Sequence, residues 1–420
     1  MRTLQQPLFT PDTEWIPPDR LPDLSGHMEI AIDLETRDPN LMTMGSGSVR
    51  GDGEVVGIAV AVEGWSGYFP IAHEGGGNMD RALVLDWFEE LLHNTATKIF
   101  HNAMYDVSWI RSMGFSINGG IVDTMVAASL CNENRWSFTL DSVAKDYIGM
   151  RKKEKLLQDA AKEWGINPKA EMWRLPAPFV GEYAEKDAEI TLKLYHALQH
   201  EITKQDLWDV FNMETNLFPC LVDMKFKGVR VDVAKAHAVK TQLTTQEGKL
   251  LRDIKKMAGF DVEIWAAASI AKAFEKSNLP YDRTDKGAPS FTKNFLATHP
   301  HELPKLINQA REINKANTTF IDTILKHEHK GRIHSDINQI RSDDGGTVTG
   351  RFSYSNPNLQ QIPARHKELG PLIRSLFVPE EGHKWGCFDY SQQEPRILVH
   401  FASLMKLEGT GTIVDAYKDG

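Results

Sequence analysis

The chain has 420 residues, more than one ordinary hydrophobic core holds, so we expect two or three domains. Apolar residues make up 41% and charged residues 25%, as in a globular protein, and the longest apolar run, 55–62, is far shorter than the roughly 20 residues of a membrane helix. The three cysteines are too widely spaced for a disulfide framework or a zinc site, which suggests the cytoplasm, and the net charge of −9 excludes a uniformly basic surface.

Prolines are frequent in residues 1–24, which indicates an extended N-terminal lead. Strand and helix patterns then alternate through residues 25–205, and such alternation predicts an α/β domain. The strand patterns lie at 28–36, 55–62, 67–71 and 98–101, and the helical patterns lie at 80–93, from 102 onward, and at 181–200.

The pattern changes after this α/β region. Long helical segments rich in Lys, Ala and Leu dominate residues 206–331, with a turn cluster at 284–290. Short strand patterns return in residues 332–420, at 332–338 and 384–389. We therefore expect an α/β domain, then a mainly helical region, then an α+β region.

The first strand pattern carries two acidic residues on one face. Its apolar residues alternate from Met28 to Leu34, so Asp33 and Glu35 fall together on the opposite face. Two neighbouring carboxylates repel each other unless a cation lies between them. Alone, however, Asp-x-Glu is common and carries little weight.

Two further pairs have the spacing of one helical turn. Asn102 precedes Asp106 by four residues, and Asn102 is a good cap for the helix that follows the 98–101 strand. Tyr183 precedes Asp187 by four residues inside the helical run 181–200. Taken alone, the first pair favours a capped surface helix and the second favours a solvated helix face.

The order of these motifs resembles the exonuclease pattern of the DnaQ-like (RNase H-like) superfamily, in its tyrosine branch. The flanking segments 68–73 and 123–125 are similar to that family as well. The resemblance implies 3′→5′ hydrolysis of DNA with two divalent ions, Mg²⁺ or Mn²⁺. It implies that Tyr183 orients the attacking water and that Asn102 orders its turn or contacts the substrate. The implied metal ligands are Asp33, Glu35, Asp106 and Asp187.

A second resemblance begins with Thr-Gly-Arg-Phe-Ser at 349–353 and continues through 356–363. These strings resemble the segment that opens the palm of family A (Pol I-type) DNA polymerases. The resemblance implies that Arg351 reaches the minor groove at the primer terminus and that Gln360 contacts DNA. A loop arginine in a surface ion pair is the plain alternative for Arg351.

Residues 389–396 resemble motif A of the same family. The resemblance implies that Asp389 holds the catalytic Mg²⁺ ions, that Glu394 rejects a ribose 2′-hydroxyl and that Arg396 lies at the substrate. Gln393 and Pro395 depart from the family pattern, which has apolar residues there more often, although a proline is tolerated in a first helical turn. We expect a strand over 384–388 and a helix over 396–403.

Residues 227–232 resemble the opening of the polymerase region, and the stretch from Arg311 to Lys315 resembles the thumb helix that contacts the DNA backbone. A solvated helix face explains either cation as well. The expected domains are the lead (1–24), the exonuclease domain (25–205), the palm opening and helical thumb (206–331), and part of the polymerase palm (332–420).

The resemblance stops before the fingers helix and the His-Asp-Glu motif of the family. We therefore expect a bacteriophage-type DNA polymerase with proofreading, in which only the exonuclease site is complete, and dNTPs and Mg²⁺ bind the polymerase site only once it is completed. An incomplete gene, a split polymerase with a complementing C-terminal chain, and an exonuclease with a DNA-holding thumb all remain open. The rival from another class is a non-catalytic DNA-binding or assembly subunit.

Overall fold

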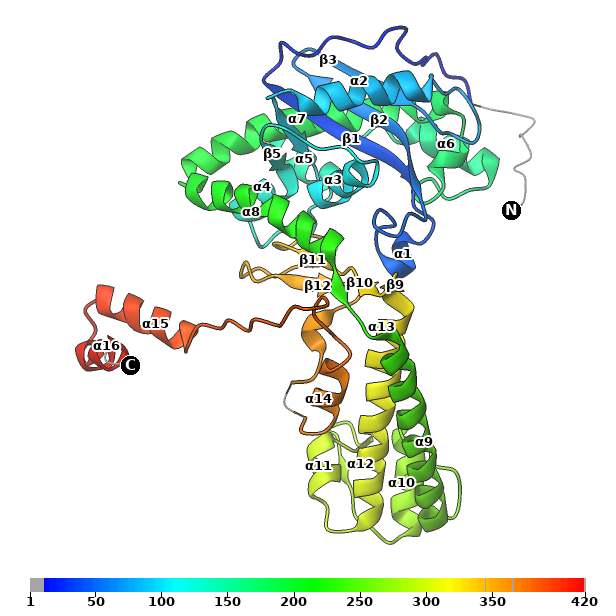
Figure 1. Ribbon diagram of the computed structural model, residues 1–420, viewed down its shortest axis with the longest axis vertical. Coiled ribbons are helices and arrows are strands. Elements are labelled where there is room, and N and C mark those ends of the chain that lie inside the picture. Colours follow the sequence, from blue (N-terminus) through cyan, green and yellow to red (C-terminus); the bar gives the residue numbers. More distant parts are fainter. Residues whose placement is uncertain (1–10, 344, 365, 419–420) are drawn as a thin grey trace. The chain divides into compact units, whose positions relative to one another are not determined.

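The computed structural model describes residues 11–343, 345–364 and 366–418 (Figure 1). They form two compact units, which divide between Val378 and Pro379. The predicted lead 1–24 lies partly outside the described residues. Its described part contacts the α/β region through Trp15, whose ring centroid is 6.0 Å from that of Tyr68. No helix within the described ranges has both the length and the apolar character that crossing a membrane requires.

A five-stranded mixed sheet forms the centre of the first α/β region, in the order β3-β2-β1-β4-β5. Its central strand β1 pairs antiparallel with β2 and parallel with β4. The four predicted strands are confirmed, each shifted by a residue or two at its ends. The strands are β1 (Glu29–Arg37), β2 (Glu54–Val62), β3 (Trp65–Pro70), β4 (Thr97–Phe100) and β5 (Ile121–Asp123).

Helices cover both faces of this sheet (Figure 1). Ile30 and Ile32 of β1 join one hydrophobic cluster, whereas Ala31 joins a second cluster that includes residues of the long helix α7. The predicted helices 80–93 and 181–200 are confirmed. The helices of this region are α1 (Leu41–Met44), α2 (Arg81–His93), α3 (Ala103–Ser112), α4 (Thr124–Cys131), α5 (Leu140–Ile148), α6 (Lys155–Trp164), the 3₁₀ turns Met172–Arg174 and Ala177–Phe179, and α7 (Gly181–Lys204).

The next helix, α8 (Trp208–Lys227), belongs in sequence to the predicted palm opening but packs against the α/β region. Phe218 and Val222 of this helix join the same hydrophobic cluster as Ile30 and Ile32. The predicted boundary at 205 therefore falls between two helices that both contact the first region. A helix with a wide apolar stripe needs a partner surface, and the sheet's helical cover supplies one.

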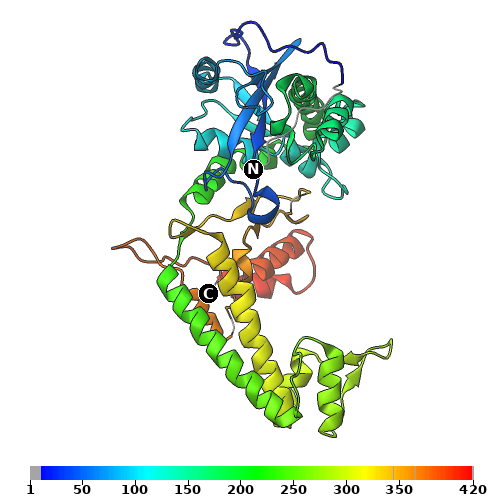
Figure 2. The same ribbon diagram turned by 90° about the vertical axis from the view of Figure 1, so that its right-hand side faces the viewer.

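Two long helices, α9 (Val233–Ala258) and α12 (Glu302–Lys315), pack side by side to form the helical region (Figure 2). The predicted turn at 284–290 is confirmed as part of a small hairpin of strands β7 (Asp282–Arg283) and β8 (Pro289–Ser290). The other helices are α10 (Ala267–Lys276), α11 (Lys293–Thr298), the π-helical segment Ala316–Ile321 and α13 (Asp322–His327).

The predicted strand 332–338 is present but divides into two strands with different partners. β10 (Arg332–Ile333) pairs with β6 and β9, whereas β11 (Asp336–Asn338) pairs with β12. The partner elements are β6 (Val229–Arg230), β9 (Glu328–His329) and β12 (Ser353–Ser355), and the 3₁₀ turn Leu359–Gln361 and α14 (Leu369–Arg374) follow them.

The second unit contains the helices α15 (Gln393–Leu404) and α16 (Thr410–Lys418). The helix predicted over 396–403 is confirmed, and Pro395 lies in its first turn. The strand predicted over 384–389 is wrong, because this segment has no regular structure. A strand requires a neighbour for its backbone N–H and C=O groups, and within residues 379–418 no other strand forms.

Candidate active site

The site is built around Asp33 and Glu35 on the central strand β1. Both side chains project from the same face as Ala31, which is the face that α7 covers. Opposite Glu35 in the β1–β2 register stands Gly57. A Cβ at Gly57 would lie 1.9 Å from the Tyr68 hydroxyl oxygen, so glycine leaves the space that the Tyr68 ring fills.

Asp106 reaches β1 from the first turn of α3. Its Oδ1 accepts a hydrogen bond from the backbone N–H of Leu34 at 3.0 Å, between Asp33 and Glu35 in the chain. The side chain is only 4% exposed. This bond places the Asp106 carboxylate beside the two acids of the strand, although it is 72 residues away from Leu34 in sequence.

The turn that begins α3 differs from the prediction at Asn102. Asn102 adopts the left-handed conformation, with φ of 68°, and its side chain forms no cap hydrogen bond. Asp123 caps this helix instead, because its carboxylate accepts the backbone N–H groups of Asn102 at 3.0 Å and Ala103 at 2.8 Å. The capping role of Asn102 was therefore wrong, since a left-handed residue directs its side chain away from the following N–H groups. Asparagine tolerates this conformation better than most residues.

Asp187 and Tyr183 lie one turn apart on α7, which packs over the sheet face that carries Asp33. Asp187 is 2% exposed, and its Oδ1 is buried without a hydrogen-bond partner among the described residues. Its Oδ2 accepts a charged hydrogen bond from Lys152, and the same ammonium lies 3.2 Å from the Tyr183 hydroxyl. The structure thus brings all four predicted acids and Tyr183 into one site.

Burial and mutual repulsion dominate the electrostatics of these acids. Burial, followed by the charge of Asp187, raises the pKa of Asp33 to about 7, while Lys152 opposes this rise. Burial and the charges of Asp33 and Asp187 raise the pKa of Glu35 well above its usual value. Burial and the charge of Asp33 do the same to the pKa of Asp106. Carboxylates that raise one another's pKa lie within each other's electrostatic reach.

Tyr183 is neutral in this environment. Burial and then the charge of Asp187 raise the pKa of its phenol well above the usual value. A protonated hydroxyl both donates and accepts hydrogen bonds. Tyr183 is half-buried, so its hydroxyl is available both to the acids and to a ligand from solvent.

The donor set fits divalent cations, although the side chains are not arranged as a finished metal site. Within the described ranges, no three His, Cys, Asp or Glu side chains are placed to hold a metal ion. Yet four carboxylates gather here, three buried and Asp33 half-buried, and one oxygen of Asp187 has no partner among the described residues. Such a group requires positive charge, and carboxylate oxygens are the ligands that Mg²⁺ and Mn²⁺ prefer. Lys152 supplies part of this charge as the chain stands.

Lys152 and Asp123 are the site residues whose roles the sequence did not reveal. Lys152 lies within the basic run Arg151–Lys153, whose only sequence signal is its charge. Asp123 was noted solely through its resemblance to the family. The motif spacing contains no information about which of three consecutive cations points inward.

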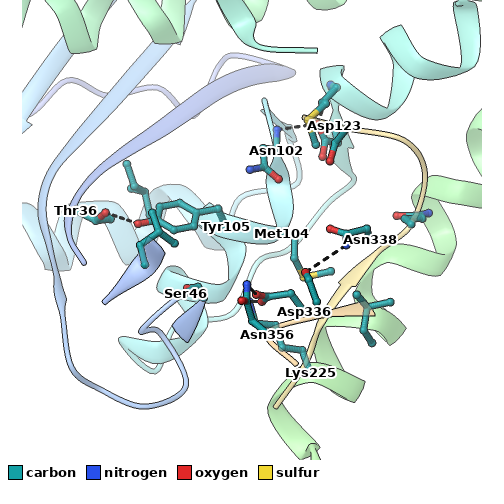
Figure 3. Close-up of a pocket in the computed structure, with 18 of the residues that line it drawn as sticks. Thr36, Ser46, Asn102, Met104, Tyr105, Asp123, Lys225, Asp336, Asn338 and Asn356 are labelled. Atoms are coloured by element: carbon teal, nitrogen blue, oxygen red, sulfur yellow. Dashed lines mark hydrogen bonds and ion pairs between the residues drawn. The ribbon is translucent and has the colours of Figure 1, made fainter. Parts of the chain in front are cut away.

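A cavity of 640 Å³ lies beside Glu35 (Figure 3). Thr36 and Tyr105 line one side, where their hydroxyl groups are 2.6 Å apart. The other side comes from residues after the helical region: Asp336 accepts a hydrogen bond from Asn356 at 3.0 Å and pairs with the buried Lys225 at 2.9 Å. Further lining residues include Met42, Asn102, Met104, Met125, Met172 and Asn338.

In the helical region, the structure gives Arg311 a contact within the protein. Its guanidinium donates to the carbonyl oxygens of Ile264 at 2.6 Å and Phe291 at 2.8 Å, and it lies over the Trp265 ring. Lys315 is exposed at the end of α12. The DNA contacts expected of these two cations stay predictions.

The predicted polymerase residues are divided between the two units. In the first unit, the Gln360 side chain donates to the Phe352 carbonyl at 3.0 Å, one residue beyond Arg351. In the second, Asp389 is exposed in the irregular segment before α15, and Glu394 lies in the first turn of that helix. Arg396 donates to the Tyr417 carbonyl at 2.9 Å and so joins α15 to α16. The roles of these residues stay predictions.

Comparisons with known proteins agree with the two halves of the sequence. Residues 10–203 match the family model described as 3′-5′ exonuclease, and residues 233–410 match the model described as DNA polymerase family A. Asp33, Glu35, Asp106, Tyr183 and Asp187 fall within the first match. The second match includes the predicted thumb helix and the 349–363 and 389–396 motifs.

Related proteins come from phages and bacteria. The chain is 37% identical to a DNA-directed DNA polymerase of Pseudomonas phage M6 and 32% identical to the DNA polymerase DpoZ of Salmonella phage PMBT28, over 97% and 95% of its length. It spans 64% of the length of each of these relatives. DNA polymerase I of Pseudomonas aeruginosa is 31% identical over 83% of this chain and 39% of its own length.

The fold agrees with that of a solved polymerase. The polymerase domain of Pol1 from M. smegmatis, in complex with a DNA primer-template and dNTP, matches 90% of this chain and 60% of its own with a TM-score of 0.69. At 20% sequence identity, this match bears on the fold alone. Together with the family matches, it leads to one conclusion: the chain belongs to DNA polymerase family A and carries a 3′-5′ exonuclease region ahead of its polymerase region.

Proposed function

We propose that this protein is a DNA-directed DNA polymerase with a 3′→5′ proofreading exonuclease that acts in phage DNA replication, and that Asp33, Glu35, Asp106 and Asp187 form the exonuclease centre. The convergence of these four carboxylates from β1, α3 and α7, three of them buried and Asp33 half-buried, is the observation that carries the proposal. Segments far apart in sequence would not bury mutually repelling acids together without a function for them. The phage relatives support the role in replication.

Asp33, Glu35, Asp106 and Asp187 would hold two divalent ions, Mg²⁺ or Mn²⁺. Bound there, the ions would lower the pKa of the attacking water and neutralise charge on the leaving oxygen of the DNA. The protein's own contribution is to hold the carboxylates at fixed positions. The hydrogen bond from Leu34 to Asp106 and the packing of α7 over β1 provide this rigidity.

Tyr183 would position the water that attacks the terminal phosphodiester. Its raised pKa keeps the hydroxyl protonated, so the hydroxyl offers one donor and two acceptor positions near Asp187. A group that orients water without changing charge suits this task. Loss of the hydroxyl should slow hydrolysis while leaving DNA binding intact.

The substrate would be a single-stranded or frayed 3′ end, held in the cavity beside Glu35. Its lining combines amide groups, such as those of Asn102, Asn338 and Asn356, with methionine side chains. Amides form hydrogen bonds with base edges, and apolar side chains contact base faces, which become accessible only when a strand is unpaired. Duplex DNA would first have to fray.

The polymerase region would bind the primer–template and the incoming dNTP. By family membership, Arg351 and Gln360 would contact the primer terminus, Asp389 would hold Mg²⁺, Glu394 would exclude ribonucleotides and Arg396 would lie at the substrate. Arg311 and Lys315 would support or contact the DNA backbone from the thumb. Phosphate contacts of this kind make binding fall steeply with added salt.

The test compares two acid-to-amide variants, Asp33→Asn and Asp389→Asn, each in a different proposed metal site. The purified chain should release mononucleotides from a 3′-labelled single strand in Mg²⁺ or Mn²⁺. Asp33→Asn should lower this rate by several orders of magnitude, whereas Asp389→Asn should leave it unchanged. Circular dichroism checks that both variants fold. Equal nuclease rates in wild type and Asp33→Asn would refute the assignment, and an inert wild type that still binds DNA would favour the non-catalytic alternative.

A further inference from the structure

Lys152 is directed into the acid site by the loop 149–154, which joins α5 to α6. The backbone N–H of Lys152 donates to Oδ1 of Asp141 at 3.0 Å, which anchors the loop to the start of α5. The Lys152 side chain is 17% exposed, and its ammonium contacts both Asp187 and the Tyr183 hydroxyl. The side chain of Asp187 is 3% exposed.

The neighbouring basic residues point elsewhere. Arg151 pairs with Asp141 at 3.3 Å and Lys153 pairs with Glu182 at 2.5 Å, and both of these basic side chains are more than half exposed. Exposed pairs of this kind contribute little to stability. Of the three consecutive cations, Lys152 alone reaches the buried acids, and Lys153 provides a matched control that pairs with the same helix, α7.

We propose that Lys152 is the internal counter-ion of the exonuclease centre: its ammonium holds Asp187 and Tyr183 in the metal-free protein, and a divalent ion must displace it from Asp187 in order to bind. Lys152 is thus a positioning residue. The identity of the displacing ion rests on the proposed function, whereas the ammonium's contacts do not.

The charges in the site explain why the ammonium is needed in the metal-free protein and why a divalent ion can displace it. Four clustered carboxylates without a cation would either repel one another or take up protons, at a cost in stability. One ammonium offsets one of these charges, and Oδ1 of Asp187 has no hydrogen-bond partner in the part of the chain that the structure describes. A divalent ion brings more charge and competes for the same carboxylate.

The choice of lysine also matters. Its ammonium is a compact, strongly hydrated charge on a flexible stem, so it leaves a carboxylate readily. It therefore keeps the site assembled between metal-binding events without blocking them. The counter-ion makes the metal-free protein more stable and metal binding weaker, and these opposite effects distinguish it from a residue that merely supports the fold.

The experiment titrates the full chain with MnCl₂ alone by calorimetry, for wild type, Lys152→Met, Lys152→Gln, Lys152→Arg and Lys153→Met. Lys152→Met and Lys152→Gln should tighten Mn²⁺ binding at the first site by about tenfold or more, or about 1.4 kcal/mol. Lys152→Arg should keep weak binding because it retains the charge. Lys153→Met should bind Mn²⁺ as wild type does.

Thermal unfolding of the same proteins supplies the second readout. In EDTA, Lys152→Met and Lys152→Gln should melt at a lower temperature than Lys153→Met, and saturating Mn²⁺ should abolish this difference. Lys152→Gln keeps a hydrogen-bond donor on the side chain. It therefore provides the same comparison if Lys152→Met fails to fold.

The proposal would be overturned if Lys152→Gln and Lys153→Met had the same Mn²⁺ affinity and the same melting temperature in EDTA. Such a result would leave the exonuclease assignment standing, because that assignment depends on the Asp33→Asn comparison. Conversely, tighter Mn²⁺ binding in a protein that never hydrolyses DNA would support the counter-ion and count against the proposed function.

Discussion

The buried histidine His73 predicts a measurable loss of stability in acid. It lies just after β3, is 3% exposed and donates from Nδ1 to the Leu175 carbonyl at 3.1 Å. Because a carbonyl only accepts, the proton of the neutral ring lies on Nδ1, and Nε2 accepts from the Tyr68 hydroxyl at 2.6 Å. Burial lowers the pKa of His73 from 6.5 to about 4.

The sign and size of the effect follow from this pKa. The unfolded chain binds a proton at His73 below about pH 6.5, whereas the folded protein resists it until about pH 4, so folding loses stability as the pH falls through this window. The full loss is roughly 3 kcal/mol, of which about 2.5 kcal/mol is already reached near pH 4.5. At pH values well above 6.5 the ring is neutral in both states and contributes nothing to the pH dependence.

The assay is urea unfolding of wild type and His73→Gln at about pH 7 and about pH 4.5, with the free energy of unfolding extrapolated to water. Comparing the two proteins cancels the titration of the nearby acids, which both share. His73→Gln should be less stable near pH 7, because its amide cannot satisfy both partners as the ring does. Its disadvantage should shrink by about 2.5 kcal/mol near pH 4.5. A difference between the two proteins that stays constant over this range would refute the buried neutral histidine.

Two further substitutions test the framework of the site. Gly57→Ala places a Cβ 1.9 Å from the hydroxyl oxygen of the fully buried Tyr68, so the free energy of unfolding should fall by about 1–3 kcal/mol in urea titrations, with a loss of nuclease activity. Gly26→Ala, where a Cβ meets nothing within 4 Å, should match wild type, and an equally stable Gly57→Ala would contradict the close packing. Asp123→Asn leaves one acceptor oxygen where two now cap α3, so thermal and urea unfolding should show a loss of about 1 kcal/mol. An unchanged stability would show that the caps are replaceable.

The features that depended on local periodicity could be predicted from the sequence. The alternation in β1 placed Asp33 and Glu35 on the face opposite Ile30 and Ile32, and the structure has them so. The four-residue spacing of Tyr183 and Asp187 likewise placed both on one side of a helix. Period-2 and period-3.6 patterns are defined within one continuous segment, so they assign side chains to a face correctly wherever the segment forms the predicted element.

The errors arose where a distant segment overrode a local preference. Asn102 is a favourable capping residue by type, but the Asp123 carboxylate, about 20 residues later, accepts the N–H groups of Asn102 and Ala103, and Asn102 stands in the left-handed conformation without a side-chain cap bond. Residues 384–389 have a strand pattern, but within residues 379–418 no strand pairs with them. A single segment does not reveal which other segment will satisfy its hydrogen bonds.

The position of Lys152 beside the acids is the clearest example of a contact that a single sequence segment does not reveal. The order of the motifs identified four acids that need a cation among them. The sequence alone does not tell whether the protein or a metal ion supplies that cation. Lys152 is one of three adjacent basic residues with the same local pattern, and what distinguishes it is that Asp141 holds the loop so that this side chain points to Asp187. Because the Lys152 ammonium already neutralises Asp187, a metal ion must displace this ammonium in order to bind there. The affinity of this site for divalent ions is therefore set by Lys152 as well as by the four acids, and substitution of Lys152, or of the Asp141 that anchors its loop, should change metal affinity without altering any proposed ligand.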